Sequence, residues 1–221
     1  GSCQIDNSRA TLLRKGLAAN EVLTDLDLQN NYIGDAGVSS LADALKVNAA
    51  LKRLCLNFNK IGPTGAAALA DALKVNAVLK VLRVRGNHIG EQGAKALASA
   101  LKVNATLNKL YLAGNKIGDP GATTLAKILK VNVVLRKLDL SWNQIGPDGA
   151  IALAQAIKVN TVLTNLNLNF NGVTVHGAAA LSKALNSHVV LADMDLRFNQ
   201  IGDTGATALG DALKTPHPLV N

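Results

Sequence analysis

The chain has 221 residues, of which 48% are hydrophobic and only 3% aromatic, so its core has to consist mainly of Leu, Ala, Val and Ile. It carries 23 Lys and Arg against 15 Asp and Glu, a net charge of +8 that suits an acidic partner. No run of 18 apolar residues and no charged-then-apolar leader occurs, so neither a membrane span nor a secretion signal is predicted. The two cysteines follow no disulfide spacing and favour a reducing, cytoplasmic location without membrane binding.

The sequence contains a 28-residue repeat whose complete copies begin at Leu23, and residues 1–22 match the later part of one copy. Four of their residues recur in kind 28 positions later: Ile5, Leu13, Leu17 and Asn20 match Ile33, Leu41, Leu45 and Asn48. The opening Gly-Ser is typical of a cloning remnant. We therefore predict that residues 1–22 are a partial N-terminal repeat, its helical half.

From Leu23 the sequence cycles every 28 residues without insertion. The seven copies begin at Leu23, Leu51, Leu79, Leu107, Leu135, Leu163 and Leu191. In each copy, L-x-x-L-x-L alternates as a strand with one buried side, and the second half, as in residues 66–76, spaces Leu as a helix with one apolar stripe. One unit cannot bury its own apolar face, so stacked units have to form the core. We predict seven repeats over residues 23–218 and the start of a truncated strand at 219–221.

The remaining fixed positions have structural explanations. Glycines at positions 12 and 15 flank the helix start, where a tight turn or a close backbone approach favours a missing Cβ. Acids between these glycines and lysines at the helix end complement the helix dipole. Asn at position 9 of every unit predicts a ladder of amides, and Cys3 replaces it in the partial unit. The Asn series that follows each helix (Asn20, Asn48, Asn76, Asn104, Asn132 and Asn160) is interpreted as left-handed C-caps.

The pattern L-x-x-L-x-L-x-x-N-x-I-G-x-x-G-A at a 28-residue period resembles the ribonuclease-inhibitor class of leucine-rich repeats. The stretch LDLSWNQIGPDGA, residues 138–150, is most similar to the C-terminal repeats of NOD-like receptors, proteins of innate immunity. The resemblance implies an α/β fold: a curved solenoid with a parallel inner sheet and outer helices. It also implies that proteins bind along the concave face and its rims. The wider class includes Ran GTPase-activating protein and tropomodulin.

Charge varies systematically along the strand side of the units. The first unit has Asp25 and Asp27, and the last has Asp193 and Asp195 beside Arg197. Between them, the sixth unit is neutral, whereas units two to five have ten bases and one acid, Asp139: Lys52, Arg53, Lys60, Lys80, Arg83, Arg85, Lys109, Lys116, Arg136 and Lys137. Four strands span about 15 Å, enough for a basic patch that steers an acidic partner. The alternative is a solvated face that binds nothing.

Position 8 is aromatic in four units: Phe58, Trp142, Phe170 and Phe198. In two adjacent units it is Gly86 and Gly114, which predicts a notch about 14 Å wide between Phe58 and Trp142. We predict that this notch is the principal contact site, with a set of concave-face residues: Arg53, Arg83, Arg85, Lys109, Tyr111, Lys137 and Trp142. The alternative is that these aromatics only pack between neighbouring turns.

Residues that could carry chemistry are sparse. Cys55 is expected to be exposed beside bases that could lower its pKa, and it is interpreted as an incidental thiol, with a redox role as the alternative. The histidines, His88, His176, His188 and His217, are not paired at metal-ligand spacing. No catalytic triad and no phosphate-binding loop occurs, so we expect no enzyme activity, cofactor or metal.

The sequence therefore favours a protein-interaction module, a sensor or regulatory repeat domain that binds an acidic protein on its concave face. One alternative is a regulator of a GTPase or an actin filament, similar to Ran GTPase-activating protein or tropomodulin. Another is nucleic-acid binding by the basic patch, with Tyr111 and Trp142 stacking bases. Neither end shows a polar cap, which predicts end-to-end self-association.

Overall fold

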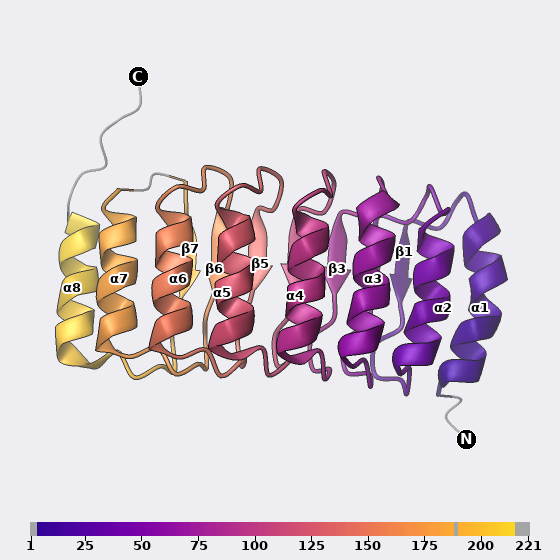
Figure 1. Cartoon of the computed structure of the whole chain (residues 1–221), viewed down its shortest axis with the longest axis horizontal. Helices are drawn as coiled ribbons and strands as arrows, with labels where there is room; N and C mark the ends of the chain where they lie inside the picture. The colour runs from indigo at the N-terminus through magenta and orange to yellow at the C-terminus, as the bar shows by residue number, and fades with distance from the viewer. Residues whose placement is uncertain (1–3, 188–189, 215–221) are drawn as a thin grey trace.

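The computed structural model describes residues 4–187 and 190–214, in which helices and strands alternate (Figure 1). Helix α1 (Asn7–Ala19) comes first, and seven strand–helix pairs follow it. They are β1 (Asp25–Asp27) and α2 (Asp35–Leu45), β2 (Arg53–Cys55) and α3 (Pro63–Val75), β3 (Val81–Arg83) and α4 (Gly90–Leu101), β4 (Lys109–Tyr111) and α5 (Gly118–Leu129), β5 (Lys137–Asp139) and α6 (Pro147–Ile157), β6 (Asn165–Asn167) and α7 (Val175–Leu185), and β7 (Asp193–Asp195) and α8 (Gly202–Lys214). The predictions for the opening Gly-Ser, Cys3, His188, His217 and residues 219–221 lie outside the described residues.

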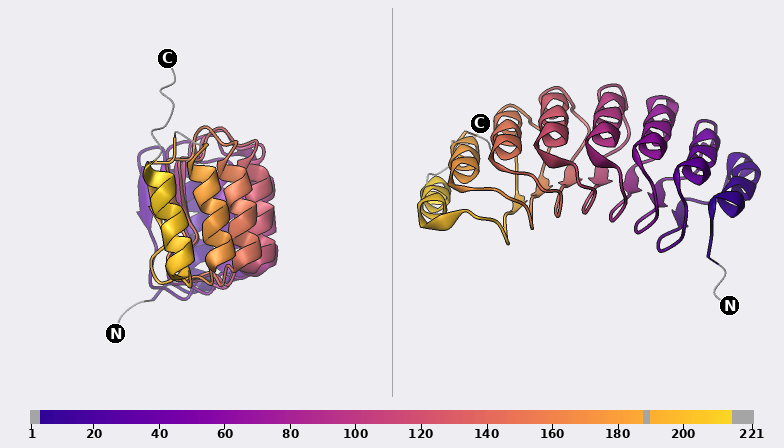
Figure 2. Two further views of the ribbon diagram at one scale, coloured as in Figure 1. Left: turned by 90° about the vertical axis from the view of Figure 1, so that its left-hand side faces the viewer. Right: turned by 60° about the horizontal axis from the view of Figure 1, so that its bottom comes forward.

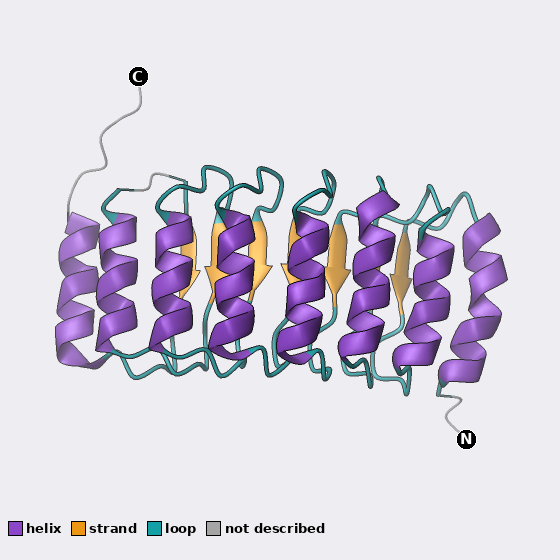
Figure 3. Ribbon diagram, viewed as in Figure 1, coloured by secondary structure: helices purple, strands orange, loops and turns teal. Residues whose placement is uncertain are grey.

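The strands form one parallel sheet in chain order, β1 to β7. Each residue of β1 to β6 pairs with the residue 28 positions later, as Asp25 does with Arg53 and Arg83 does with Tyr111. All helices lie on one side of the sheet (Figure 3), and the helices form the outer side of an arc (Figure 2, right). This arrangement confirms the predicted α/β solenoid with a parallel inner sheet and outer helices.

The core is a continuous aliphatic layer between sheet and helices. The fourth unit shows the pattern: Leu107, Leu110, Leu112, Ile117 and Leu125 are all buried. The predicted role of glycine at position 15 is confirmed as well. A Cβ at Gly121 would lie 2.4 Å from a methyl carbon of Ile117 and 3.2 Å from the Cβ of Ala94, so only glycine lets neighbouring helices pack this closely.

The predicted asparagine ladder is present, and it bonds each unit to the one before. The Nδ2 of Asn115 donates to the carbonyls of Val84, Leu112 and Ala113 at 2.9, 2.9 and 3.2 Å. Its Oδ1 accepts from the backbone N–H of Ile89 at 3.3 Å. Because these backbone groups are buried, the amide satisfies polar groups that water cannot reach.

The second asparagine series does not form left-handed caps, so that prediction was wrong. Asn76 has φ −73° and ψ 123°, an extended conformation. Its Nδ2 donates to the carbonyls of Leu45 and Asn48 in the preceding unit, at 2.7 and 3.1 Å, and its Oδ1 accepts from the N–H of Leu79 at 2.8 Å. The series is a second ladder: its side chains, rather than a left-handed turn, satisfy carbonyls at the end of the preceding helix.

Two of the acids at the helix starts, Asp35 and Asp119, bond to the next unit, which their helix-dipole interpretation did not foresee. Asp35 accepts through Oδ1 from the N–H groups of Gly62 and Gly65, at 2.6 and 2.9 Å. Asp119 bonds to Gly146 and Gly149 in the same way, at 2.7 and 2.8 Å. These carboxylates therefore cap the helix of the following unit.

Candidate binding surface on the concave face

The concave face is built from the two strand residues on either side of the central one, which packs against the core, because side chains alternate across a strand. The row at position 3 is Asp25, Arg53, Val81, Lys109, Lys137, Asn165 and Asp193, and the row at position 5 is Asp27, Cys55, Arg83, Tyr111, Asp139, Asn167 and Asp195. The sheet register aligns these rows in the predicted order, with acids at both ends and bases between them.

The bases gather around one tyrosine in the middle of the sheet. The guanidinium carbon of Arg83 lies over the Tyr111 ring, 5.2 Å from its centroid, and Lys137 Nζ lies over the same ring at 5.9 Å. Lys109 pairs in register with Lys137. Among the residues the structure describes, Arg83, Arg85, Lys109 and Lys137 form no ion pair. The structure therefore brings Arg83 and Lys137 together at Tyr111, with Lys109 two residues before Tyr111 on the same strand, whereas Arg85 lies over the Phe58 ring. These residues are named here the basic cluster: Arg83, Arg85, Lys109, Tyr111 and Lys137.

Arg53 belongs to a different environment from the rest of the predicted contact set. Its Nε forms an ion pair with Asp25 on the neighbouring strand. The hydrogen bonds from Thr24 and Arg53 hold the pKa of Asp25 below its ordinary value. Arg53 thus links the basic cluster to the acidic first unit.

The acids of the last unit are engaged in a similar way. Asn165 donates to Asp193 Oδ2 at 2.9 Å, and Arg197 donates to both oxygens of Asp195 at 2.9 and 2.6 Å. The Arg197 bonds lower the pKa of Asp195 to about 2. A hollow of about 270 Å³ joins this acidic end to the basic cluster, with Tyr111 and Lys137 on one side and Asp193 and Asp195 on the other. The concave face therefore changes charge sign across a single depression.

Three of the position-8 aromatics form a stack along the rim, here called the aromatic column: Trp142, Phe170 and Phe198. The ring centroids of Trp142 and Phe170 are 3.8 Å apart with planes inclined by 18°, and those of Phe170 and Phe198 are 4.0 Å apart at 15°. The packing of aromatics between neighbouring turns, which the sequence left as an alternative, is therefore present for these three rings.

The predicted notch is narrower than its two glycines suggested. A Cβ at Gly86 would lie 2.5 Å from Cδ1 of Phe58, so the Phe58 ring already covers Gly86. The guanidinium carbon of Arg85 lies 5.7 Å from the centroid of the same ring. A Cβ at Gly114 would have only the backbone of Gly86 within 4 Å, at 3.6 Å. The open part of the notch is the space over Gly114, between the Phe58 ring and Trp142, and we call it the Gly114 gap.

The expectation that Cys55 is exposed was wrong, and its pKa is not lowered. Its side chain is buried, with 8% of the residue exposed, and burial is the main cause that raises the pKa of the thiol. Arg83 does lower that pKa, but this effect is smaller than the effect of burial and is opposed by Asp27. Cys55 Sγ instead lies 3.8 Å from the side-chain oxygen of Gln29.

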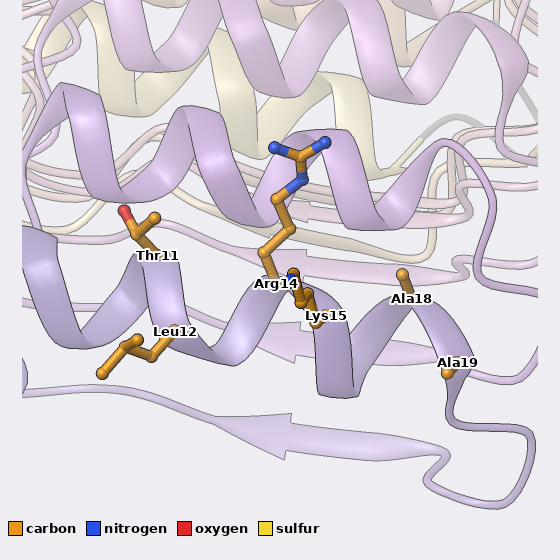
Figure 4. Close-up of a pocket in the computed structure, with 6 residues that line it drawn as sticks. All are labelled: Thr11, Leu12, Arg14, Lys15, Ala18 and Ala19. Atoms are coloured by element: carbon orange, nitrogen blue, oxygen red, sulfur yellow. The ribbon is translucent and has the colours of Figure 1, made fainter.

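A further hollow lies on the first helix, away from the strands of the concave face. It measures about 700 Å³ and runs along α1, lined by Leu12, Arg14 and Lys15 among other residues of that helix (Figure 4). Within residues 4–187 and 190–214, His, Cys, Asp and Glu form no group of three or more that could hold a metal ion. In the same part of the chain no helix is long and apolar enough to cross a bilayer.

A parallel sheet of 28-residue units, backed by helices and joined by an asparagine ladder, defines a solenoid repeat protein. The sequence profile of the leucine-rich repeat family matches this chain seven times, at residues 19–42, 47–70, 75–98, 103–126, 131–154, 159–182 and 193–210. The chain therefore belongs to the leucine-rich repeat family.

Two solved structures are similar to this chain. One is described as leiomodin-1 actin-binding site 2, with 23% identity and a TM-score of 0.58 over 68% of this chain and 87% of that one. The other is a tropomodulin C-terminal domain from Caenorhabditis elegans, with 14% identity and a TM-score of 0.57 over 71% and 93%. At these identities the likeness establishes a common fold. A search of curated proteins finds no match.

Proposed function

We propose that this chain is a protein-binding module without enzyme activity, and that its concave face binds an acidic segment of a partner protein. The observation that carries the proposal is the basic cluster, whose Arg83, Lys109 and Lys137 form no ion pair within the described residues. Charges left uncompensated on a rigid sheet attract a ligand of opposite charge and need little reorganisation to bind it.

Within this proposal the contact residues are those of the basic cluster together with Trp142, and Arg53 contributes at the margin because it is already paired with Asp25. Arg83, Arg85 and Lys109 are exposed, and Tyr111 and Lys137 are half-buried. An Arg- and Tyr-rich centre with charged surroundings is the composition of binding hot spots. A receptor-like role in innate immunity and a cytoplasmic location also belong to the proposal, and they rest on the resemblance of residues 138–150 to NOD-like receptor repeats.

A charge-reversal experiment tests the proposal with a synthetic acidic peptide, EEDADEE, in low salt. The double substitution Arg83→Glu and Arg85→Glu is expected to weaken binding at least tenfold, because it turns attraction into repulsion at the centre of the face. The matched control is Lys102→Glu with Lys127→Glu, which changes the net charge equally through exposed lysines near the ends of α4 and α5. Equal affinities of the two double variants in calorimetry would refute a localised site.

A second candidate function is actin binding, favoured by the likeness to the leiomodin-1 actin-binding site 2. It is tested by co-sedimentation with actin filaments. Recovery of the chain in the filament pellet, reduced by Arg83→Glu with Arg85→Glu but not by the helix-lysine control, would identify actin as the acidic partner. No enrichment in the pellet at any filament concentration would exclude this candidate.

Nucleic-acid binding is less well supported by the geometry. Single strands bind by stacking successive bases on aromatic faces, but Arg83 and Lys137 both lie over the Tyr111 ring, which leaves Trp142 alone of the two predicted stacking residues with a face for a base. We therefore expect EEDADEE to bind more tightly than a thymidine strand of equal charge. A strand that bound more tightly, with an affinity that fell steeply as salt was raised, would reverse this assignment.

End-to-end self-association is a further part of the proposal. Leu12 of α1 is 78% exposed and Leu213 of α8 is 73% exposed, so the first and last described helices both present apolar side chains. Light scattering is expected to show a mass that rises with concentration, and the double substitution Leu12→Glu and Leu213→Glu is expected to abolish the rise. A mass that stays constant in the unsubstituted protein would contradict this expectation.

A further inference from the structure

Every position-8 residue of the seven units has a left-handed backbone. The values of φ lie between 51° and 66° for Asn30, Phe58, Gly86, Gly114, Trp142, Phe170 and Phe198. For residues other than glycine this conformation costs about 1–2 kcal/mol, and bulky aromatic residues rarely adopt it. Aromatic rings at such a position require a compensating contact, and the stacking of the aromatic column supplies it.

The Gly114 gap interrupts what would otherwise be a longer column. Trp142 uses one ring face against Phe170, yet the residue is still 51% exposed. On the other side of the gap, the Phe58 ring covers Gly86, and Phe58 is 48% exposed. The backbone of Gly114, with φ 66°, already has the conformation that holds a ring at Trp142, with φ 57°. The gap therefore lies between two aromatic residues, and its backbone has the conformation that carries a ring elsewhere in the column, but Gly114 has no side chain to fill it.

We propose that the Gly114 gap receives one aromatic side chain of the acidic partner, stacked on the free face of Trp142. This inference rests on the proposed function and names the residue by which the partner is recognised. About 14 Å separates the backbones of Phe58 and Trp142, and the Phe58 ring takes the place over Gly86. The remaining place accommodates a single ring at the spacing of about 4 Å found in the column.

The charges beside the gap select the residues that flank this ring. Lys116 is exposed two residues after Gly114, and Arg85 lies beside the Phe58 ring. Acidic residues on either side of the aromatic side chain would therefore contact bases while the ring stacks. A nucleic-acid strand fits less well because strands bind by stacking successive bases, and this gap has room for one planar group.

The test uses Trp142 as its own reporter, because it is the only tryptophan of the chain. Two peptides are compared, EEDFDEE and EEDADEE, which differ only in the central residue. The phenylalanine peptide is expected to bind about 3–10-fold more tightly, as an aromatic pair supplies about 0.5–1.5 kcal/mol beyond area burial. It is also expected to change the intensity of Trp142 emission, whereas EEDADEE leaves that emission nearly unchanged.

Filling the gap from within the chain is the decisive variant. Gly114→Phe is expected to reduce the advantage of EEDFDEE to less than twofold, while EEDADEE still binds. Gly114→Asn provides a second, milder variant, because Asn30 has the same left-handed backbone at this position, and it is expected to lower the advantage as well. The matched control is Phe198→Ala, which removes a ring at the far end of the column and is expected to preserve the advantage.

The outcomes separate the two levels of the proposal. Equal binding of the two peptides to the unsubstituted protein overturns the aromatic site and leaves the acidic-partner function standing. Binding of neither peptide overturns both. A seven-nucleotide thymidine strand that bound more tightly than EEDFDEE in the same buffer, and quenched Trp142 more strongly, would assign the gap to a nucleobase and overturn the proposal.

Discussion

The units of the central strands β3 to β5 and those of the final strands β6 and β7 share one backbone register. They differ in whether their charged side chains form ion pairs and whether their aromatic rings are stacked. In the final strands, charges are engaged within the chain, as Asp195 is by Arg197, and Phe170 is stacked on both faces. In the central strands, Arg83 and Lys137 lie over the Tyr111 ring and form no ion pair within the described residues, and Gly86 and Gly114 interrupt the series of rings. One scaffold thus carries a region whose charges and rings pair within the chain, beside a region whose bases form no ion pair within the described residues.

The largest expected effect tests whether the shared ladder is equally important in both regions. Asn115→Ala is expected to lower the free energy of unfolding by about 3 kcal/mol, because buried carbonyls of Val84 and Leu112 lose their donor. Asn199→Ala removes the same kinds of bond from a half-buried site and should cost about 1 kcal/mol. Urea unfolding measures both, and equal losses would show that burial does not set the cost.

Helix capping between units differs in the two regions, and it can be removed from one and added to the other. Asp119→Ala is expected to cost about 1 kcal/mol, because the N–H groups of Gly146 and Gly149 lose their acceptor. Val175 has the place in α7 that Asp119 has in α5, one unit before the helix that would be capped. Val175→Asp is therefore expected to add a cap to α8 and to raise the free energy of unfolding by up to about 1 kcal/mol. Thermal unfolding checks the two signs, and a loss at both sites would contradict capping across units.

Ring removal should distinguish the inside of the aromatic column from its edge. Phe170→Gly removes the conformational cost of a left-handed backbone at a residue other than glycine, but it also removes stacking on two ring faces. A net destabilisation of about 1 kcal/mol is therefore expected. At Trp142 a single stacked face is lost, and Trp142→Gly is expected to be nearly neutral. If urea unfolding shows the larger loss at Trp142, stacking is not what stabilises rings at position 8.

The smallest effect is confined to acid pH. Because the folded-state pKa of Asp195 is lowered to about 2, its ionised form contributes stability at neutral pH, and that contribution is lost as the pH falls from about 4 to about 2. Arg197→Ala is expected to move this pKa up toward the ordinary value for aspartate. A carboxyl-carbon NMR titration follows Asp195 directly, with Asp25 as an internal reference that should not change. An unaltered Asp195 titration would mean that Arg197 is not the main cause of the shift.

The 28-residue period was sufficient to predict the strands, the helices, their stacking and the first asparagine ladder, because each follows from a fixed spacing of Leu, Gly and Asn. The parallel inner sheet and the outer helices were implied by the resemblance to ribonuclease-inhibitor-like leucine-rich repeats. It was not sufficient for features that depend on contacts between units. Asp35 caps the helix after its own, Asn76 bonds back to the preceding helix, and Phe58 covers Gly86, all across about 28 residues. Cys55 was misjudged because alternation alone does not reveal how far neighbouring strands cover a small side chain.

The bonds between units also determine which insertions and deletions in the sequence the fold can accept. Asn115 bonds to Val84, 31 residues earlier, and Asp35 bonds to Gly62, 27 residues later, so an insertion of a few residues would misalign both at once. Whole units can be removed without that misalignment. Excision of residues 79–106 would set Gly114 directly beside Phe58 and leave one glycine between Phe58 and Trp142. Insertions or deletions can therefore change the width of the Gly114 gap only by whole units, that is, by one strand spacing at a time.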